Sequence, residues 1–171
     1  MLFRSIGVNG SAFSIEFWFQ TPSTPSATTN LVSLSGLLNS NLGFDSNNNL
    51  ILNFGLGDSG SGNSSIATNA SNNPLSNNTW YYVVGTYSTQ TQELSLYLNA
   101  QLIETVSNVT FTPPTTSNLT LAGSSDSVYL DEVALYGSVL DYNPPSADGS
   151  LTGLELINTL SGTNQIGRAH V

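Results

Sequence analysis

The side chains of this chain that could do chemistry are carboxylates, amides, hydroxyls and aromatic rings. Lysine and cysteine are absent, and Arg4, Arg168 and His170 are the only basic side chains among 171 residues. The lack of cysteine excludes thiol chemistry, disulfides and cysteine-based zinc sites. With one histidine, next to the last residue, there is no Ser-His-Asp arrangement that could activate a nucleophile.

The carboxylates are the remaining groups that could supply a nucleophile and a general acid, as paired carboxylates do in glycoside hydrolases. One strand brings two carboxylates together only if both alternate onto the same face. Asp131 and Glu132 are adjacent and so point to opposite faces, and Glu16 and Glu93 each stand alone in their segments. We therefore predict that the chain is not an enzyme, although a pair assembled from different strands is left open.

One alternating segment, residues 13–20, places polar and aromatic groups together on one face. Its odd positions hold Phe or Ile, which is typical of a half-buried strand. Its even positions put Glu16, Trp18 and Gln20 on the outer face. Since binding sites combine an apolar or aromatic wall with a few polar groups, we predict ligand contacts at these residues and at Glu132. The alternative is structural, with Trp18 covering the sheet and the carboxylates bonded to nearby backbone.

The elements that would position these residues are strands, because the apolar pattern has period two nearly everywhere. Segments rich in Gly, Pro, Asn and Ser separate them, and residues 151–160 are the one stretch compatible with a short helix. We predict strands at residues 13–20, 31–34, 41–44, 50–54, 80–87, 93–99, 101–106, 119–122 and 128–136, with a weak one near Ile66. About nine strands without a convincing helix indicate an antiparallel sandwich or barrel.

Three details follow from this arrangement. The inward apolar side chains should be buried between two sheets, namely Phe13, Ile15, Phe17, Phe19, Leu94, Leu96, Leu98, Val133 and Leu135. We also assign Trp80, Tyr81 and Tyr82 to the core, since residues 80–87 are apolar on both faces. The turn at Asn99-Ala100 should be strained by about 1 kcal/mol, or be of another type, because a type I′ turn needs positive φ at both positions.

The charge of the chain limits its partners. The formal net charge is −9, and charged residues make up 8% of the sequence. Nucleic acids and anionic membrane surfaces attract clustered Lys and Arg, which this chain lacks. It also lacks a run of about 18 apolar residues that could span a membrane. We therefore predict no nucleic-acid binding and no membrane insertion, and the polar but weakly ionic composition favours an extracellular or cell- or virion-surface location.

Three segments, in order, resemble the laminin-G-like and pentraxin-like branch of the concanavalin A-like superfamily. They are FSIEFWFQTP from Phe13, NTWYYVVGTYSTQTQELSLYLNAQLIET from Asn78, and NLTLAGSSDSVYLDEVALYGSVLD from Asn118. The resemblance covers residues 11–141 and implies an all-β, antiparallel two-sheet jelly-roll sandwich. It departs from the family at Asn99-Ala100, where Asn-Gly is usual, and before residue 11, where an opening strand is expected.

The resemblance also implies calcium as a cofactor. Calcium binds carboxylate, amide and carbonyl oxygens in loops. Asp45, Asn47 and Asn49 alternate at a predicted hairpin tip, and Asp58 and Asp126 lie in two other Gly- and Ser-rich loops. We predict that these residues supply the site if there is one. The alternative is ordinary turn chemistry, since turns select Asp, Asn and Ser.

The ends of the chain lead to a division into three parts. Residues 1–141 form the domain, residues 142–165 a linker or the start of a following region, and residues 166–171 resemble a translated sequencing adapter. Such an end would suit a fragment from assembled environmental DNA that lacks its opening strand and signal peptide. We expect residues from about Gly149 onward, Ile166–Val171 above all, to pack poorly.

Taken together, these observations predict a non-catalytic module of a larger extracellular or surface protein. Its partner would be a glycan or an extracellular protein. A purely structural spacer in a surface or virion protein is the alternative, and a glycoside hydrolase is less favoured. Exposed aromatic rings on one sheet would favour binding, whereas a face of Ser and Thr would favour the spacer.

Overall fold

The computed structural model describes most of the region expected to form the domain. The described residues are 12–57, 65–67, 75–110, 119–122, 128–137, 139 and 165–169, the second and last of these ranges for their backbone alone. All regular elements within them are β-strands. The strands are β1 Ala12–Gln20, β2 Thr29–Leu34, β3 Leu38–Phe44, β4 Leu50–Leu56, β5 Ser65–Ala67, β6 Tyr81–Ser88, β7 Glu93–Leu98, β8 Gln101–Val106, β9 Leu119–Leu121, β10 Tyr129–Tyr136 and β11 Gln165–Ala169.

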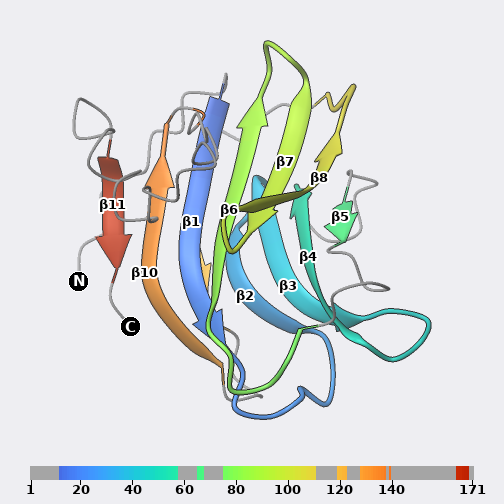
Figure 1. Cartoon of the computed structure of the whole chain (residues 1–171). Coiled ribbons are helices and arrows are strands. Elements are labelled where there is room, and N and C mark those ends of the chain that lie inside the picture. Colours follow the sequence, from blue (N-terminus) through green and yellow to red (C-terminus); the bar gives the residue numbers. More distant parts are fainter. Residues whose placement is uncertain are drawn as a thin grey trace, which may run out of the picture.

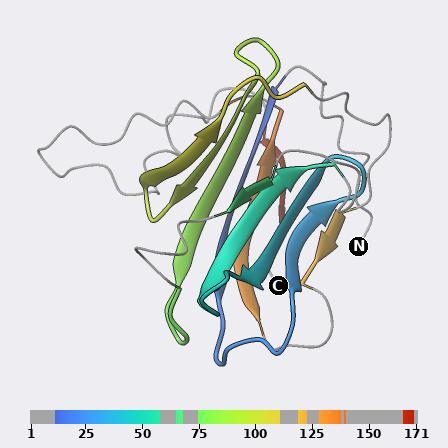
Figure 2. The same ribbon diagram turned by 90° about the vertical axis from the view of Figure 1, so that its right-hand side faces the viewer.

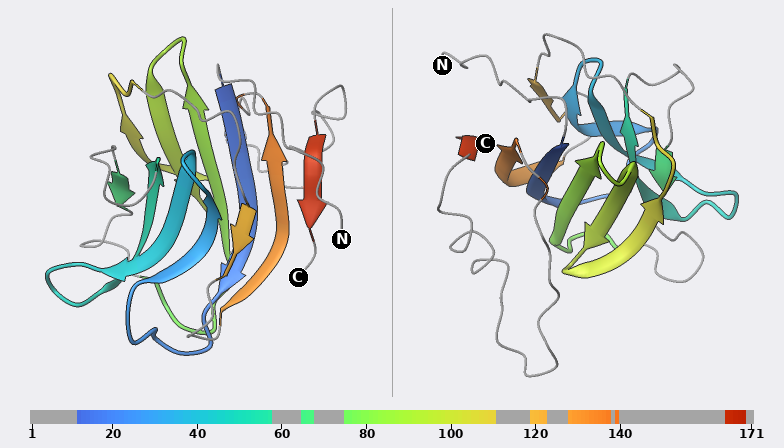
Figure 3. Two further views of the ribbon diagram at one scale, coloured as in Figure 1. Left: turned by 180° about the vertical axis from the view of Figure 1, so that it is seen from behind. Right: turned by 90° about the horizontal axis from the view of Figure 1, so that it is seen from above.

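The strands form two antiparallel sheets that pack face to face. One sheet has six strands in the order β11-β10-β1-β6-β7-β8, and the other has five in the order β5-β4-β3-β2-β9. The six-stranded sheet lies in front in Figure 1, and strands β2 and β3 lie in front when the molecule is seen from behind in Figure 3. Figure 2 shows the β6–β7–β8 side of one sheet beside the β2–β3–β4 sheet. The predicted all-β antiparallel sandwich is confirmed.

The core between the sheets is built from the inward positions of both. All nine side chains predicted to be inward are buried: Phe13, Ile15, Phe17, Phe19, Leu94, Leu96, Leu98, Val133 and Leu135. Strands β2, β3 and β4 supply the opposing layer, which includes Leu31, Leu42, Leu52 and Phe54. The two sheets are in close contact at Gly85, where an added Cβ would lie 1.9 Å from Cζ of Phe54. This contact shows that a glycine in β6 makes room for the opposing ring.

The hairpin between β7 and β8 has the strained turn that its sequence predicts. Leu98 pairs with Gln101, so that Asn99 and Ala100 form a two-residue loop. Both loop residues have positive φ, 48° at Asn99 and 68° at Ala100. The turn is therefore of the type I′ class, and Ala100 occupies a position where glycine would have less strain.

Part of the C-terminal end that we expect to pack poorly forms a short strand, β11, at the edge of the six-stranded sheet. Within β11, Ala169 pairs with Val133 and Arg168 with Ala134, antiparallel to β10. A free edge of β10 would leave a row of backbone N–H and C=O groups unpaired, and an extended segment can satisfy them through backbone alone. Such pairing does not depend on the origin of the sequence, so the adapter interpretation of Ile166–Val171 stays a prediction.

Other expectations fall outside the described residues. They concern the stretch compatible with a helix at residues 151–160 and the loop residues Asp58 and Asp126. Within the part of the chain that the structure describes, no helix has the length and hydropathy needed to cross a membrane.

Candidate functional site

The candidate site lies on the outer face of the six-stranded sheet, which is the face turned away from the five-stranded sheet. Strand β1 is central here, with β10 on one side and β6 on the other. Trp18 of β1 pairs with Tyr82 of β6 and with Asp131 of β10. Paired residues in a sheet point to the same face, so these three strands bring together side chains from distant parts of the sequence.

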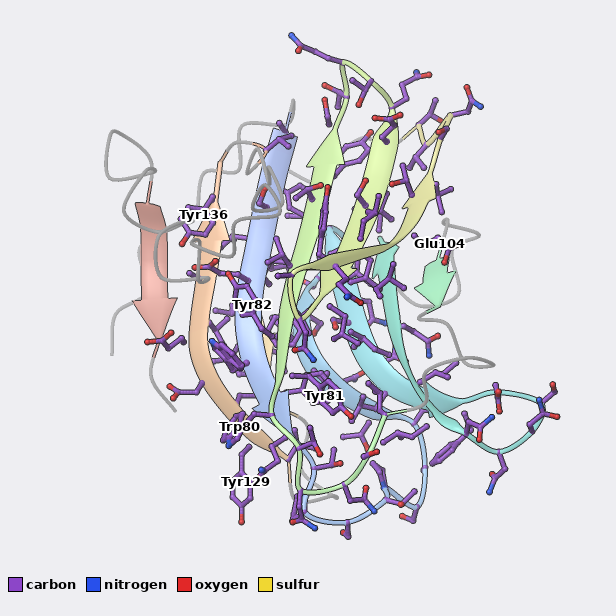
Figure 4. The ribbon with its side chains drawn as sticks, viewed as in Figure 1. Trp80, Tyr81, Tyr82, Glu104, Tyr129 and Tyr136 are labelled. Atoms are coloured by element: carbon purple, nitrogen blue, oxygen red, sulfur yellow. The ribbon has the colours of Figure 1, made fainter. Side chains whose placement is uncertain are left out.

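Glu16 lies beneath the surface of this face and is bound by two tyrosines. Only 3% of the residue is exposed. Oη of Tyr82 donates to Oε2 of Glu16 at 2.5 Å, and Oη of Tyr136 donates to Oε1 at 2.5 Å. Hydrogen bonds to both oxygens of a carboxylate compensate the cost of burying it. We call Glu16, Tyr82 and Tyr136 the carboxylate–tyrosine cluster; Figure 4 labels both tyrosines.

Trp18 is next to this cluster and packs on one of its tyrosines. The ring centroids of Trp18 and Tyr82 are 5.0 Å apart, with the planes tilted by 36°. The backbone of Tyr82 is held in turn by the turn residue Asn99. Oδ1 of Asn99 accepts a hydrogen bond from the Tyr82 N–H at 2.9 Å, and the Asn99 N–H donates to the Tyr82 carbonyl at 2.8 Å. Trp18 is therefore partly buried against Tyr82, whose backbone is bonded to Asn99 and whose hydroxyl is bonded to Glu16.

A row of three side chains crosses the sheet where β1 ends. Gln20 pairs with Tyr129 of β10. On the other side, the last pair of β1 and β6 is Phe19 with Tyr81, and continuing this register by one residue sets Trp80 opposite Gln20. Trp80 is 42% exposed and Tyr129 is 53% exposed, whereas Gln20 is partly buried. We call Tyr129, Gln20 and Trp80 the aromatic row. Figure 4 labels Trp80 and Tyr129, both at the lower end of the sheet in that view.

The assignment of Trp80 to the core is wrong. Strand β6 begins at Tyr81, and Tyr81 is the residue whose ring turns inward to stack on Phe19, with centroids 5.4 Å apart. Alternation then turns Trp80 and Tyr82 to the outer face. Tyr81 packs against the main core and Tyr82 lies in the smaller outer cluster with Val84 and Ala134, so both are covered.

A β-bulge in β10 places the acidic residues of that strand. Glu16 pairs with Ala134 and Trp18 with Asp131, so Glu132 and Val133 together oppose the single residue Phe17. Glu132 has a φ of 49°, and its N–H donates to Oδ1 of Asp131 at 2.8 Å. A bulge twists the strand locally and changes the direction of its side chains. Here it leaves Asp131 beside Trp18 and puts Glu132 in the left-handed region, off the regular ladder.

The Asp45 loop has the contacts of a turn. Oδ1 of Asp45 accepts from the N–H groups of Asn47 at 2.9 Å and Asn49 at 2.7 Å, and Oδ2 accepts from Nδ2 of Asn49 at 3.0 Å. These bonds, that of the Asn49 N–H first, hold the pKa of Asp45 below its usual 3.8. The loop projects away from β10 in Figures 1 and 3.

The hydrogen bonds to the carboxylate oxygens of Asp45 are those of the ordinary turn that the sequence analysis gave as the alternative to a calcium site. Among the described residues, no three Asp, Glu, His or Cys side chains gather where they could hold a metal ion. Asp58 and Asp126 are not described, so calcium binding stays a prediction.

The structure brings some predicted ligand residues together and separates others. Glu16, Trp18 and Gln20 share the outer face of β1, and Glu132 lies at the bulge opposite them. The sequence analysis missed Trp80 and Tyr129 as exposed rings, and Tyr82 and Tyr136 as partners of Glu16. Alternation about the buried Leu130 could have indicated that Tyr129 faces outward. No sequence signal pairs the two tyrosines with Glu16.

Comparison with known proteins identifies a family and a fold that this chain shares. A family model for laminin-G-type domains, described as the concanavalin A-like lectin/glucanases superfamily, matches residues 2–143. No curated protein matches the chain. The relationship at the level of sequence therefore rests on the family model, which covers residues 2–143.

Solved structures with the same fold are distant in sequence. A native heptameric SAP-like pentraxin from Limulus polyphemus has 15% identity and a TM-score of 0.55, and the match covers 78% of this chain and 68% of that one. The binding domain of botulinum neurotoxin DC, solved with rat synaptotagmin II, has 15% identity and a TM-score of 0.58, with coverages of 79% and 34%. The receptor binding domain of botulinum neurotoxin type G has 16% identity and a TM-score of 0.58, with coverages of 78% and 36%. The chain thus spans about a third of each toxin domain.

Proposed function

The chain belongs to the concanavalin A-like lectin/glucanases superfamily, and we propose that it is a non-catalytic carbohydrate-binding module of a larger extracellular or surface protein. The observation that carries this proposal is the pair of exposed aromatic rings, Trp80 and Tyr129, on the outer face of the six-stranded sheet. An aromatic ring left in water at the end of a sheet is an apolar surface available to a ligand. The structurally similar toxin domains are named for binding a receptor, which agrees with a binding role.

The state of Glu16 supports a role in binding rather than catalysis. A glycosidase needs one carboxylate that attacks the sugar or activates water, and another that protonates the leaving group. Both oxygens of Glu16 accept short hydrogen bonds from tyrosines, and the residue is buried. We infer that Glu16 holds Tyr82, on which Trp18 packs, in place and does not contact the ligand.

The spacer alternative is favoured by one part of the same face. Ser14, Thr86, Ser95 and Thr105 follow one another across β1, β6, β7 and β8, and the hydroxyls of Ser95 and Thr105 are 2.9 Å apart. A row of small hydroxyl side chains offers no aromatic surface to a ligand. The outer face therefore has a hydroxyl row at one end and the exposed rings of Trp80 and Tyr129 at the other. The end with the rings is the one to test for ligand binding.

A glycan array tests the proposal directly. The whole chain, displayed in many copies on a particle, is compared with its Trp80→Ala and Trp18→Ala variants. One site should bind in the micromolar to millimolar range, about −4 to −8 kcal/mol, so multivalent display is needed to detect it. Leu102→Ala removes another exposed apolar side chain, 56% exposed on β8, and serves as the matched control.

We expect the wild type and Leu102→Ala to bind the same glycans and Trp80→Ala to bind them less. Trp18→Ala should also bind less, because it removes a ring from the same face of β1 and leaves the ring of Tyr82 without its packing partner. A folded wild-type chain that binds no glycan would favour the structural spacer instead.

Calcium binding is a separate proposal. Added calcium should raise the melting temperature of the protein above that of a chelator control, since a ligand of the native state stabilises it.

A further inference from the structure

We propose that the aromatic row is a two-ring platform for an uncharged, extended glycan chain that runs across β10, β1 and β6. The inference rests on the proposed carbohydrate binding and adds to it the residues that hold the ligand and the ligand's class. Its first support is exposure. The described residues include four exposed large hydrophobic side chains, Trp80, Leu102, Tyr129 and Val139. Only two of them are aromatic, and both belong to the row.

The orientation of the row follows from its neighbours in the chain. Leu130 is buried in the main core, and Tyr81 stacks on the core residue Phe19. Alternation along β10 points Tyr129 to the outer face. Trp80 directly precedes the inward-facing Tyr81, the first residue of β6, and its 42% exposure shows that it is turned away from the core. Gln20 lies between them on β1. Both rings and the amide therefore face the same side of the sheet.

The spacing of the row fits a chain of sugars better than a single one. Tyr129 and Trp80 are on strands separated by β1, so their backbones are two strand spacings apart, or about 10 Å. That span is close to the length of a disaccharide unit. Each ring can pack against the apolar C–H face of a pyranose, and a chain with equatorial linkages presents such faces along its length. A monosaccharide would contact only one ring.

The polar groups between the rings match hydroxyls. The amide of Gln20 both donates and accepts hydrogen bonds, as a sugar hydroxyl does. Asp131 lies on the same face in the next row, beside Trp18, and one of its oxygens accepts from the Glu132 N–H. Trp18 lies on the same face of β1, two residues before Gln20, and its ring packs at a tilt on that of Tyr82. A platform that is already fixed in place loses little conformational entropy on binding.

Charge selects against acidic glycans. The chain has a net charge of −9, no lysine, and arginines only at positions 4 and 168. Neither arginine lies in β10, β1 or β6: Arg168 is on β11, where it pairs with Ala134, five residues along β10 from Tyr129. The carboxylates of Asp131 and Glu132 are closer to Tyr129 in the chain. Sialylated or sulfated sugars would bring further negative charge close to Asp131, on three strands, β10, β1 and β6, that contain no Lys or Arg. The ligand class is therefore a neutral glycan.

The experiment measures binding of the full chain to soluble cello-oligosaccharides and chito-oligosaccharides of increasing length, beside a printed array that includes sialylated and sulfated glycans. We expect affinity to rise with length until both rings are covered. Trp80→Ala and Tyr129→Ala should each weaken binding to long chains about tenfold, or about 1.4 kcal/mol. They should also abolish the dependence on length, since one ring remains. Trp80→Phe and Tyr129→Phe keep a ring and should keep most of the affinity.

The outcomes separate the inference from the function on which it rests. Glycan binding that survives Trp80→Ala and Tyr129→Ala with its length dependence intact would place the site elsewhere and overturn the row, while the carbohydrate-binding function would stand. Binding confined to sialylated or sulfated glycans would overturn the neutral class alone. If the folded wild type binds no glycan of any kind, the function and the row both fall.

Discussion

The carboxylate–tyrosine cluster shows how one buried charge organises the outer face. Glu16 is almost inaccessible, and its two oxygens are bound by tyrosines from β6 and β10. A buried charge of this kind is tolerated only when its acceptor sites are used. The cluster therefore ties three neighbouring strands together by side chains as well as by backbone.

Tyr136→Phe should lower the free energy of unfolding by about 2 kcal/mol, because it leaves one oxygen of a buried carboxylate without its donor. Tyr129→Phe is the matched control: it removes the hydroxyl of an exposed tyrosine on the same strand and should change the free energy of unfolding little. Urea denaturation measures both. In a Glu16→Gln background, Tyr136→Phe should cost less, since the charge has gone. Equal costs in the two backgrounds would show that Tyr136 stabilises the fold independently of Glu16.

The Asp45 turn predicts a dependence of stability on pH. The folded-state pKa of Asp45 lies below 3.8, mainly because the Asn49 N–H donates to the carboxylate. A lowered pKa stabilises the folded state fully above the unfolded pKa, and this contribution is lost as pH falls through the folded pKa. We therefore expect wild type to melt at a higher temperature than Asp45→Asn at neutral pH, and the difference to shrink below pH 3.8.

Thermal unfolding across that range measures the effect, and Asn49→Ala is its control. This variant removes the side-chain donor but keeps the backbone N–H, so it should retain most of the pH dependence. A constant difference between wild type and Asp45→Asn at all pH values would show that the turn does not depend on the charge.

At the scale of the elements, alternation in the sequence was enough to predict most strands and their inward side. It could not reveal what covers the other side. Glu16 looked like a surface residue because it is polar, yet its partners Tyr82 and Tyr136 come from 66 and 120 residues further along the chain. The bulge at Glu132 was equally hidden, since it depends on the pairing of β10 with β1. The local sequence pattern predicts which side chains are buried on the inner face of a strand. The burial of side chains on the outer face depends on which strands pair with it.

The β7–β8 turn offers a test at this scale. Ala100→Gly should raise the free energy of unfolding by about 1 kcal/mol, because Ala100 has a φ of 68° and glycine adopts that conformation without a clash of Cβ. Ala27→Gly is the control at a position that is not among those with positive φ, and it should be neutral or destabilising, since glycine gains more entropy on unfolding. Urea denaturation compares the two, and destabilisation by Ala100→Gly would contradict the type I′ geometry.

For the molecule as a whole, Gly85 of β6 and Phe54 of β4 bring the two sheets into contact at a point with no space for a Cβ on Gly85. Gly85→Ala should lower the free energy of unfolding by about 3 kcal/mol, since the new methyl group would overlap the Phe54 ring and the core has no room to absorb it. Phe54→Leu should be destabilising alone but should cost less in the Gly85→Ala background, because the smaller side chain relieves the overlap. Additive losses in the double variant would show that the two residues do not meet.

The two tryptophans of the chain differ in their surroundings, and this gives the protein two built-in fluorescent reporters. Trp18 is partly buried against Tyr82, whereas Trp80 stands 42% exposed at the end of the sheet. A soluble quencher such as acrylamide should therefore reach Trp80 first, and emission from Trp18 should change mainly when the sandwich opens. With Trp80→Phe and Trp18→Phe variants, each signal can be recorded alone. Fluorescence of Trp80 then reports ligand binding at the aromatic row, and fluorescence of Trp18 reports unfolding, without any added label.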